Sequence, residues 1–208
     1  MKLYYSPGAC SLAVHIVLLE SGARFQLEKV DTATHTLADG SDYYPVNRKG
    51  LVPALEIAGG ARLTEGPVIA QYIADESRRT DLMPAAGTLA RYRVMEWQNF
   101  ITSDLHKTYA VLFSPDLAAE AKVAFAEALR KKYTWVDASL AANSPYLTGT
   151  NFTAADAYLF TVTRWASFVK LDLTGLSNLQ AFMDSVAARP SVRAAMRAEG
   201  LIGTERAA

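Results

Sequence analysis

Cys10 is the single cysteine of the chain, and its place in the sequence suits a thiol with a chemical role. It follows a short aromatic run that ends at Tyr5 and the turn residues Pro7-Gly8, and it precedes a helical pattern that starts at Ser11. Backbone amides and the helix dipole at such a position stabilise an anion, so we expect the thiol to ionise more easily than a free one. The alternative is a small, buried and inert side chain, the usual state of a lone cysteine.

Two further motifs could bind an extended ligand with a charged head. Val52-Pro53 follows a glycine loop and precedes a strand, so the backbone N–H and C=O of Val52 could pair with an extended peptide. An ordinary proline at a strand start is the alternative. Glu65-Gly66 ends a strand and begins a helix, where the amides could bind a carboxylate and Glu65 an ammonium group. Together they would receive a zwitterionic amino-acid head, unless Glu65 only complements the helix dipole.

A third group of polar residues lies in a long helical pattern that runs from residue 91 to residue 112. Its members recur at helical spacing, which predicts a polar stripe on one face of an otherwise apolar helix. Such a stripe requires a ligand or a partner chain. An isolated histidine on a long helix is nevertheless more often a surface residue or a satisfied interior residue than a catalyst. The members are Asn99, Ser103, His106 and Tyr109.

The elements that must position these residues change in kind along the chain. The first third begins with a strand, a helix and a strand, which favours parallel pairing and a right-handed crossover. A hairpin turned by Gly59-Gly60 follows, and then a helix that opens at Gly66-Pro67. The predicted strands are 2–5, 25–30, 54–57 and 61–64, and the predicted helices run from 11 to 20 and from 66 onward.

After about residue 84 the strand signals stop and helical patterns continue to the end. Thr153 and Asp156 have the spacing of a capping box at the start of one of these helices. The predicted organisation is therefore an α/β domain at 1–80, a linker at 81–87 and an all-α helical domain at 88–208. The predicted helices of that domain are 91–112, 117–140, one from 153, 175–188 and 190–199.

Composition excludes several classes of function. The 208 residues carry 21 basic and 21 acidic side chains, so the positive charge expected of a nucleic-acid-binding protein is absent. No apolar run approaches the roughly 18 residues that span a bilayer, and the N-terminus does not have the pattern of a signal peptide. We therefore expect a cytoplasmic protein with neither a nucleic acid nor a membrane as partner. One cysteine excludes an internal disulfide and any Cys-x-x-Cys pair, and no metal site is expected.

Taken together, these motifs resemble the cytosolic glutathione transferases, and the bacterial beta class in particular. The similar segments follow the same order as in that class and cover nearly the whole chain, so the set is specific although each segment alone is weak. The resemblance implies an N-terminal thioredoxin-like domain of βαβ-ββα order, an all-helical C-terminal domain and a homodimer. It also implies glutathione as co-substrate and no metal. The similar segments are 4–13, 47–55, 63–66, 96–100, 105–107, 152–160 and Arg164-Trp165.

The resemblance also implies a role for each matching residue. In the family the Val-Pro bond is cis, a cysteine and a histidine lie beside the glutathione sulfur, and two polar residues reach the neighbouring subunit's glutathione. Relatives commonly have a lysine where His35 stands, and that lysine contacts the carboxylate tail. The implied catalytic residues are Cys10 and His106. The implied glutathione-binding residues are Cys10, His35, Val52, Pro53, Glu65, Gly66, Asn99, Ser103, His106 and Lys107, with Asn99 and Ser103 serving the partner subunit.

An electrophile pocket is implied beside them, walled by Tyr109, Phe113 and Trp165, for which plain hydrophobic core is the alternative. The implied function is conjugation of the glutathione thiolate to small electrophilic, largely apolar compounds, as in detoxification. Cys10 opens a second route, glutathione-dependent thiol–disulfide reduction or reductive dehalogenation, in which external glutathione would release the mixed disulfide. The non-enzymatic alternative is a binding protein for apolar ligands.

Overall fold

The computed structural model describes residues 1–203, which form two compact units. The first unit comprises Met1–Met83 together with the chain from Ala188 onward, and the second comprises Pro84–Ala187. This division differs from the predicted one, because the described residues after 187 belong with the sheet and not with the helical domain. Residues 204–208 of the predicted domain 88–208 lie outside the described residues.

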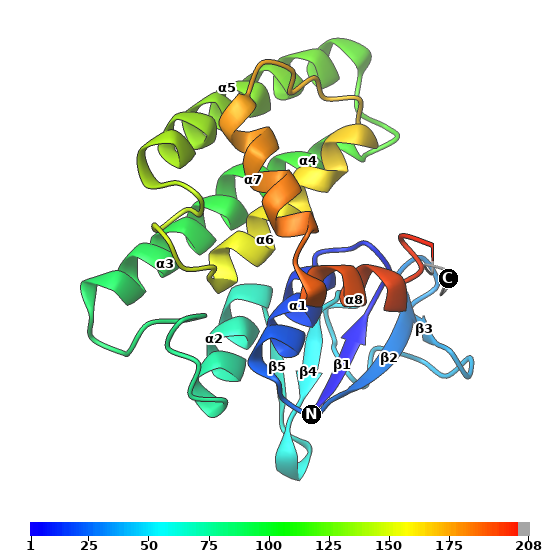
Figure 1. The fold of residues 1–208 in the computed structure, drawn as a ribbon. Helices are drawn as coiled ribbons and strands as arrows, with labels where there is room; N and C mark the ends of the chain where they lie inside the picture. The colour runs from blue at the N-terminus through cyan, green and yellow to red at the C-terminus, as the bar shows by residue number, and fades with distance from the viewer. Residues whose placement is uncertain (204–208) are drawn as a thin grey trace. The chain divides into compact units, whose positions relative to one another are not determined.

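The first unit is built on a five-stranded sheet with the order β3-β2-β1-β4-β5 (Figure 1). β1 pairs in parallel with β2 and antiparallel with β4, and β4 pairs antiparallel with β5. The predicted βαβ-ββα order is confirmed, and the edge strand β3 is an addition to it. The elements are β1 (Lys2–Tyr5), α1 (Ser11–Ser21), β2 (Gln26–Asp31), β3 (Thr36–Leu37), β4 (Ala54–Glu56), the 3-10 turn η1 (Ala58–Gly60), β5 (Arg62–Thr64), α2 (Gly66–Glu76) and α8 (Pro190–Ala198).

Successive residues of β1 face opposite sides of the sheet, as strand geometry requires. The Tyr5 ring lies 6.3 Å from the His15 ring of α1, whereas the Tyr4 ring lies 5.9 Å from the ring of Tyr43 on the other side. Tyr43 comes from the long loop between β3 and β4, is fully buried, and donates a hydrogen bond of 3.0 Å to the Leu51 carbonyl. The loop that leads into β4 is therefore fastened to the sheet.

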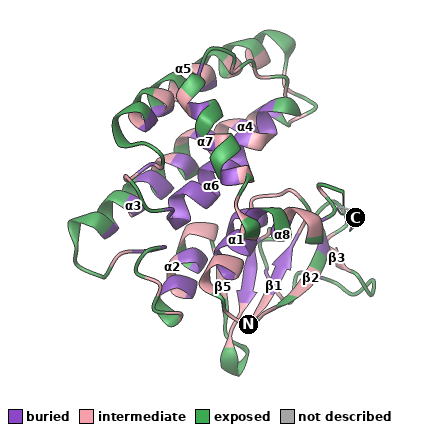
Figure 2. Cartoon of the chain, in the orientation of Figure 1, coloured by how far each residue is buried: buried purple, intermediate pink, exposed green. Residues whose placement is uncertain are grey.

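The second unit is helical throughout its regular elements, and α6 lies at its centre. Every residue of α6 is buried, which agrees with its largely apolar sequence (Figure 2). No helix in the described part of the chain is long and apolar enough to cross a bilayer. The elements are α3 (Leu89–Phe100), the π-helical turn η2 (Ile101–His106), α4 (Lys107–Leu112), α5 (Ala119–Asn143), α6 (Ala154–Thr163), the 3-10 turn η3 (Arg164–Ser167) and α7 (Ser177–Ala187).

The long helix predicted for residues 91–112 contains a π turn, η2, between α3 and α4. A π turn closes its hydrogen bond one residue later than an α turn, so spacing counted along an uninterrupted α-helix does not hold across it. The predicted polar stripe on one face is therefore wrong: Asn99 and Ser103 are exposed, His106 is partly buried, and Tyr109 is fully buried.

The predicted capping box at the start of α6 is confirmed. Asp156 is fully buried and accepts hydrogen bonds from the Thr153 backbone N–H at 2.8 Å and from the Thr153 hydroxyl at 2.7 Å. It also accepts from the backbone N–H of Leu147 at 2.9 Å, so it ties the preceding loop to the helix. Burial nevertheless raises the pKa of Asp156 from 3.8 to about 6, because desolvation outweighs these three donors.

Replacing Asp156 should show the effect of its hydrogen bonds and, separately, the effect of its raised pKa. Asp156→Ala leaves two buried N–H groups without acceptors, so we expect the free energy of unfolding to fall by about 2–5 kcal/mol. The raised pKa means that the folded state binds the proton more tightly, so protonation of Asp156 adds a separate stabilising contribution. This contribution is complete below about pH 4 and is lost as pH rises through about 6. Urea unfolding of wild type and Asp156→Asn from pH 4 to pH 7 measures this. An equal pH dependence in both proteins would contradict it.

Candidate functional site

Cys10 lies at the N-cap of α1, as predicted, with its thiol directed at the segment before β4. Its Sγ donates a hydrogen bond of 3.2 Å to the carbonyl of Val52. Burial raises the pKa of the Cys10 thiol and outweighs the N–H groups of Cys10 and Ser11, which lower it. With a smaller rise from the charge of Glu65, the pKa goes from 9.0 to about 11. The prediction that this thiol ionises easily is therefore wrong, since desolvation outweighs the amides of the helix start.

The loop that leads into Cys10 is held by Glu199, just after the last residue of α8. The Glu199 side chain is fully buried; its Oε2 accepts from the Gly8 N–H at 2.9 Å, and its Oε1 lies 2.9 Å from His15 Nδ1. Leu201 packs against the same loop, since a Cβ added to Gly8 would come 3.3 Å from its Cδ2. These contacts explain why the chain after 187 belongs to the first unit.

The Val52–Pro53 peptide bond is cis, as the resemblance implied. The Val52 carbonyl already accepts a hydrogen bond from the Cys10 thiol, so one of the two backbone groups of Val52 is engaged within the protein. Its N–H has no hydrogen-bond partner among residues 1–203 and remains able to pair with an extended ligand. Pro53 is buried behind it.

Glu65 stands between β5 and α2 with a φ of 71°, in a region that side chains other than glycine rarely adopt. Its side chain is 64% exposed. The carboxylate forms an ion pair with Lys49, whose ammonium also donates to the Thr64 hydroxyl at 2.8 Å. Sequence reasoning missed Lys49, because a lysine in the basic run 48–49 cannot be distinguished from a solvated one.

Gly66 is the first residue of α2, so its N–H has no acceptor within the helix. A Cβ added there would lie 3.9 Å from Pro53 Cγ and 3.9 Å from Val14 Cγ2, which is ordinary contact. The position therefore has room for a small side chain, and what it offers to a ligand is its backbone.

His35 lies against the loop that precedes Val52. Its Nδ1 is 3.1 Å from the carbonyl of Gly50, and its ring lies 4.8 Å from the Tyr44 ring. Gly50 has a φ of 67°, and a Cβ there would come 2.7 Å from His35 Nδ1, so both the backbone and the close approach require glycine. The structure thus brings His35, Val52 and the cysteine that bonds to Val52 into one region of the first unit.

In the second unit, His106 closes the π turn η2 and lies in an aromatic cluster. Its Nδ1 is 2.6 Å from the Tyr158 hydroxyl, and its ring lies 4.9 Å from the Trp165 ring at an angle of 68°. The Trp165 ring in turn lies 5.7 Å from Tyr109 and 5.9 Å from Phe113. The structure therefore brings the predicted histidine together with all three predicted pocket walls. Sequence reasoning missed Tyr158, because nothing local in the sequence places its hydroxyl beside the His106 ring.

These three wall residues differ in exposure. Phe113 is 47% exposed, whereas Trp165 and Tyr109 are buried. The hydroxyl of Tyr109 donates to Tyr133 at 3.1 Å, and burial raises the pKa of Tyr109. Tyr109 is thus a core residue behind the cluster, and Phe113 presents its ring to solvent.

The remaining predicted residues of this unit lie on its surface. Asn99, Ser103 and Lys107 are exposed, and the Ser103 hydroxyl lies within hydrogen-bond distance of the Asn99 carbonyl, at 3.1 Å. Asp104 accepts from Lys132, which lowers the pKa of Asp104. The surface pair Asn99 and Ser103 is therefore available to a partner, while His106 faces the aromatic cluster.

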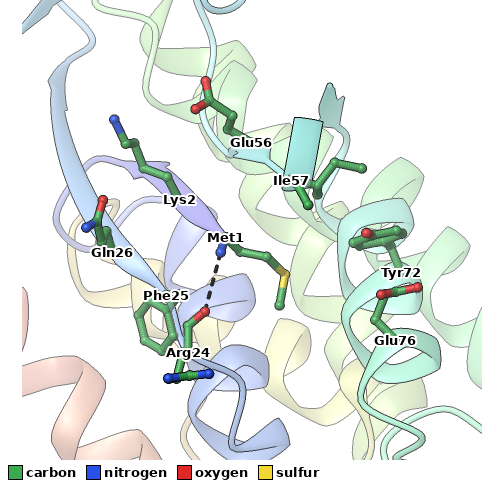
Figure 3. A pocket seen from close by; sticks show the side chains of 10 residues that line it. Met1, Lys2, Arg24, Phe25, Gln26, Glu56, Ile57, Tyr72 and Glu76 are labelled. Atoms are coloured by element: carbon green, nitrogen blue, oxygen red, sulfur yellow. Dashed lines mark hydrogen bonds between the residues drawn. The ribbon is translucent and has the colours of Figure 1, made fainter. Parts of the chain in front are cut away.

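A hollow of about 650 Å³ opens at the amino-terminal end of β1, lined among others by Lys2, Phe25, Glu56 and Tyr72 (Figure 3). It contains none of the predicted site residues, which in this unit follow the carboxyl end of β1. Within the described part of the chain, no three His, Cys, Asp or Glu residues gather in a way that could hold a metal ion.

Two protein-family models match the chain, glutathione S-transferase N-terminal domain over residues 8–76 and glutathione S-transferase C-terminal domain over residues 102–190. The glutathione S-transferase GstA of Escherichia coli O157:H7 is 48% identical over 201 residues, which are 97% of this chain and 100% of that protein. The predicted resemblance is thus confirmed.

Solved structures agree. A sphingomonad glutathione S-transferase complexed with glutathione is 43% identical, with a TM-score of 0.92 over 97% of this chain and 100% of the other. The bacterial beta class glutathione S-transferase of Sphingomonas chungbukensis is 44% identical, with the same TM-score of 0.92 over 97% and 100% of the two chains.

The raised pKa of Cys10 makes a direct prediction for its reactivity. At pH 8 about one thiol in a thousand would be ionised, against roughly a quarter of an ordinary cysteine, so alkylation by iodoacetamide should be on the order of 100-fold slower than that of a small thiol. Intact mass follows the reaction without ambiguity, because the chain has one cysteine. The rate should keep rising with pH beyond 9. Alkylation at pH 8 as fast as that of free glutathione would show that the thiol ionises readily.

Proposed function

The chain belongs to the glutathione S-transferase family, and from that premise we propose that it conjugates the glutathione thiolate to small, largely apolar electrophiles. The observation that carries this proposal is the cluster in which an imidazole, His106, meets the rings of Trp165 and Tyr158, with exposed Phe113 beside them. Aromatic surface next to a hydrogen-bonding ring suits an apolar compound that must react with an anionic sulfur.

We assign the recognition of glutathione to the first unit. The unpaired N–H of Val52, next to buried Pro53, pairs with the extended middle of the tripeptide, as an edge strand does. The N–H of Gly66 binds the carboxylate of the γ-glutamyl head, and Glu65 binds its ammonium in place of Lys49. His35, held beside Gly50, receives the carboxylate tail.

The reaction follows from these assignments. Glutathione loses its thiol proton to solvent, and His106 donates a hydrogen bond that favours the thiolate. The sulfur then gives an electron pair to the electrophilic carbon. With a chlorinated nitroaromatic, the S–C bond forms, the C–Cl bond breaks and chloride leaves. Proximity of the two reactants supplies much of the acceleration. Lys107, the residue that follows His106, adds positive charge at the start of α4.

Cys10 supports a second candidate function, thiol–disulfide exchange or reductive dehalogenation through a glutathionylated enzyme. Its partly buried thiol lies beside Val52, where the cysteinyl part of glutathione is proposed to bind. The raised pKa of Cys10 disfavours this route in the free protein, because the thiolate is the attacking form. Conjugation does not need that thiolate, since its nucleophile belongs to glutathione.

The setting of this activity is also proposed. Exposed Asn99 and Ser103 on α3 and η2 suit contact with a second copy of the chain, so we propose a homodimer in which each subunit offers them to the other's glutathione. Detoxification in the cytoplasm is the role that we infer for such a transferase. A protein that only stored apolar ligands would bind them without turnover.

Turnover of 1-chloro-2,4-dinitrobenzene and of a small disulfide, measured side by side, tests the proposed function. We expect wild type and Cys10→Ala to conjugate the nitroaromatic at similar rates, and only wild type to exchange the disulfide. His106→Asn should lower conjugation roughly 10- to 100-fold, the value of a hydrogen bond to a charged group. Loss of both activities in Cys10→Ala would favour the reductase, and absence of turnover with tight apolar binding would favour the storage protein.

Glu65→Gln tests the assignment of the head group. Because the Glu65 side chain is 64% exposed, its pair with the ligand ammonium should be worth about 0.2–1 kcal/mol, a loss of only a few-fold in glutathione affinity. Calorimetry measures this, with Glu96→Gln as a matched control, since Glu96 is 63% exposed and pairs with Arg93 in the other unit. Unchanged affinity would remove Glu65 from the site, and a loss far above tenfold would show that the bound pair is desolvated.

A further inference from the structure

The Tyr158 hydroxyl lies within hydrogen-bond distance of the His106 ring, and the proposed mechanism has no role for it so far. Tyr158 lies in buried α6, and its hydroxyl is 2.6 Å from His106 Nδ1. The two rings meet edge to face, 5.9 Å apart at 82°. This contact joins the central helix of the second unit to the last residue of the π turn.

The direction of this hydrogen bond follows from the hydroxyl of Thr102. The Thr102 hydroxyl has one proton to donate. Its Oγ1 donates that proton to the Gln98 carbonyl at 2.8 Å, a better hydrogen-bond distance than the 3.5 Å to the Tyr158 hydroxyl. The Tyr158 hydroxyl therefore has two acceptors within reach, His106 Nδ1 at 2.6 Å and Thr102 Oγ1 at 3.5 Å, and His106 Nδ1 is the better one for the phenol proton. With Nδ1 accepting, a neutral imidazole must carry its own proton on Nε2.

The orientation of the ring is fixed from a second side. Trp165 packs against the His106 ring at 4.9 Å and 68°, so the imidazole is in contact with two aromatic rings. A ring so packed cannot exchange its two nitrogens by flipping unless it leaves that cluster. The same side chains thus define which nitrogen meets Tyr158 and which one is presented elsewhere.

We propose that Tyr158 is a positioning residue, which holds His106 in the tautomer with the proton on Nε2 and so makes that nitrogen the donor to the glutathione sulfur. The second half of this statement rests on the role proposed for His106. A neutral histidine donates through one nitrogen only, so without the tyrosine hydroxyl part of the population would carry the proton on Nδ1 and could not stabilise the thiolate through Nε2.

The test is Tyr158→Phe, which removes the hydroxyl and keeps the ring. Nitrogen-15 NMR of the histidine rings at about pH 8.5, well above the pKa of about 6.5 of an unperturbed imidazole, reports which nitrogen is protonated. The chain has three histidines, and a His106→Gln variant identifies the signals of His106. We expect Nε2–H alone in wild type and a mixture of tautomers in Tyr158→Phe. Tyr133→Phe is the matched control, because the Tyr133 hydroxyl bonds to Tyr109 instead, and it should leave the His106 signals unchanged.

Kinetics supply the second readout. Tyr158→Phe should lower kcat for 1-chloro-2,4-dinitrobenzene about threefold to tenfold, the value of one ordinary hydrogen bond, with KM for glutathione little changed. A wild-type His106 protonated on Nδ1, or the same tautomer in wild type and Tyr158→Phe, overturns the proposal whatever the activity. If the tautomers behave as expected but the wild type does not conjugate, the proposed function fails and the positioning role of Tyr158 stands.

Discussion

The buried side chain of Glu199, near the end of the described chain, holds the loop before α1 in the first unit. The Glu199 side chain is fully buried and bonds to the Gly8 N–H and to His15 Nδ1. A buried charge is costly without partners, so these three groups depend on one another. Gly8 belongs to the loop that leads to Cys10 at the start of α1. The position of the thiol therefore depends on Glu199, which lies near the opposite end of the sequence. α8 is for this reason part of the thioredoxin-like unit.

Desolvation decides the chemistry at that loop. The helix start would favour a thiolate at Cys10, yet burial and the carbonyl of Val52 keep the proton on sulfur. Glu65, the residue directly before α2, is in contrast exposed and paired with Lys49. The first unit therefore offers a ligand an exposed carboxylate and a backbone N–H, together with a protein thiol whose pKa is raised. This combination agrees with a transferase whose nucleophile is brought by glutathione.

The second unit is organised around α6, whose ten residues are all buried. Asp156 secures its start, and Tyr158 and Trp165 contact the ring of His106. The π turn that ends at His106 breaks the regular rotation of the long helix. Asn99 and Ser103 consequently remain on the surface, whereas His106 faces an aromatic cluster. A continuous α-helix would have directed the His106 side chain differently.

The sequence alone determined the order of the elements, because hydrophobic period, turn glycines and caps are local signals. β1, the hairpin, the start of α2 and the capping box of α6 all follow from neighbouring residues. The candidate residues were also identified, with Cys10, Val52-Pro53 and Glu65-Gly66 at element boundaries. The resemblance to relatives added what spacing could not, including the roles of His106 and Lys107.

Only the tertiary structure decided the environments of those residues. The pKa of Cys10, the exposure of Glu65 and the burial of Tyr109 depend on side chains distant in sequence. The π turn could not be predicted either, since its sequence is compatible with an ordinary helix. Lys49, Tyr158 and Glu199 were missed for the same reason: each acts through a partner brought near by folding. Local patterns specify elements, whereas desolvation and hydrogen bonding depend on the complete set of neighbours.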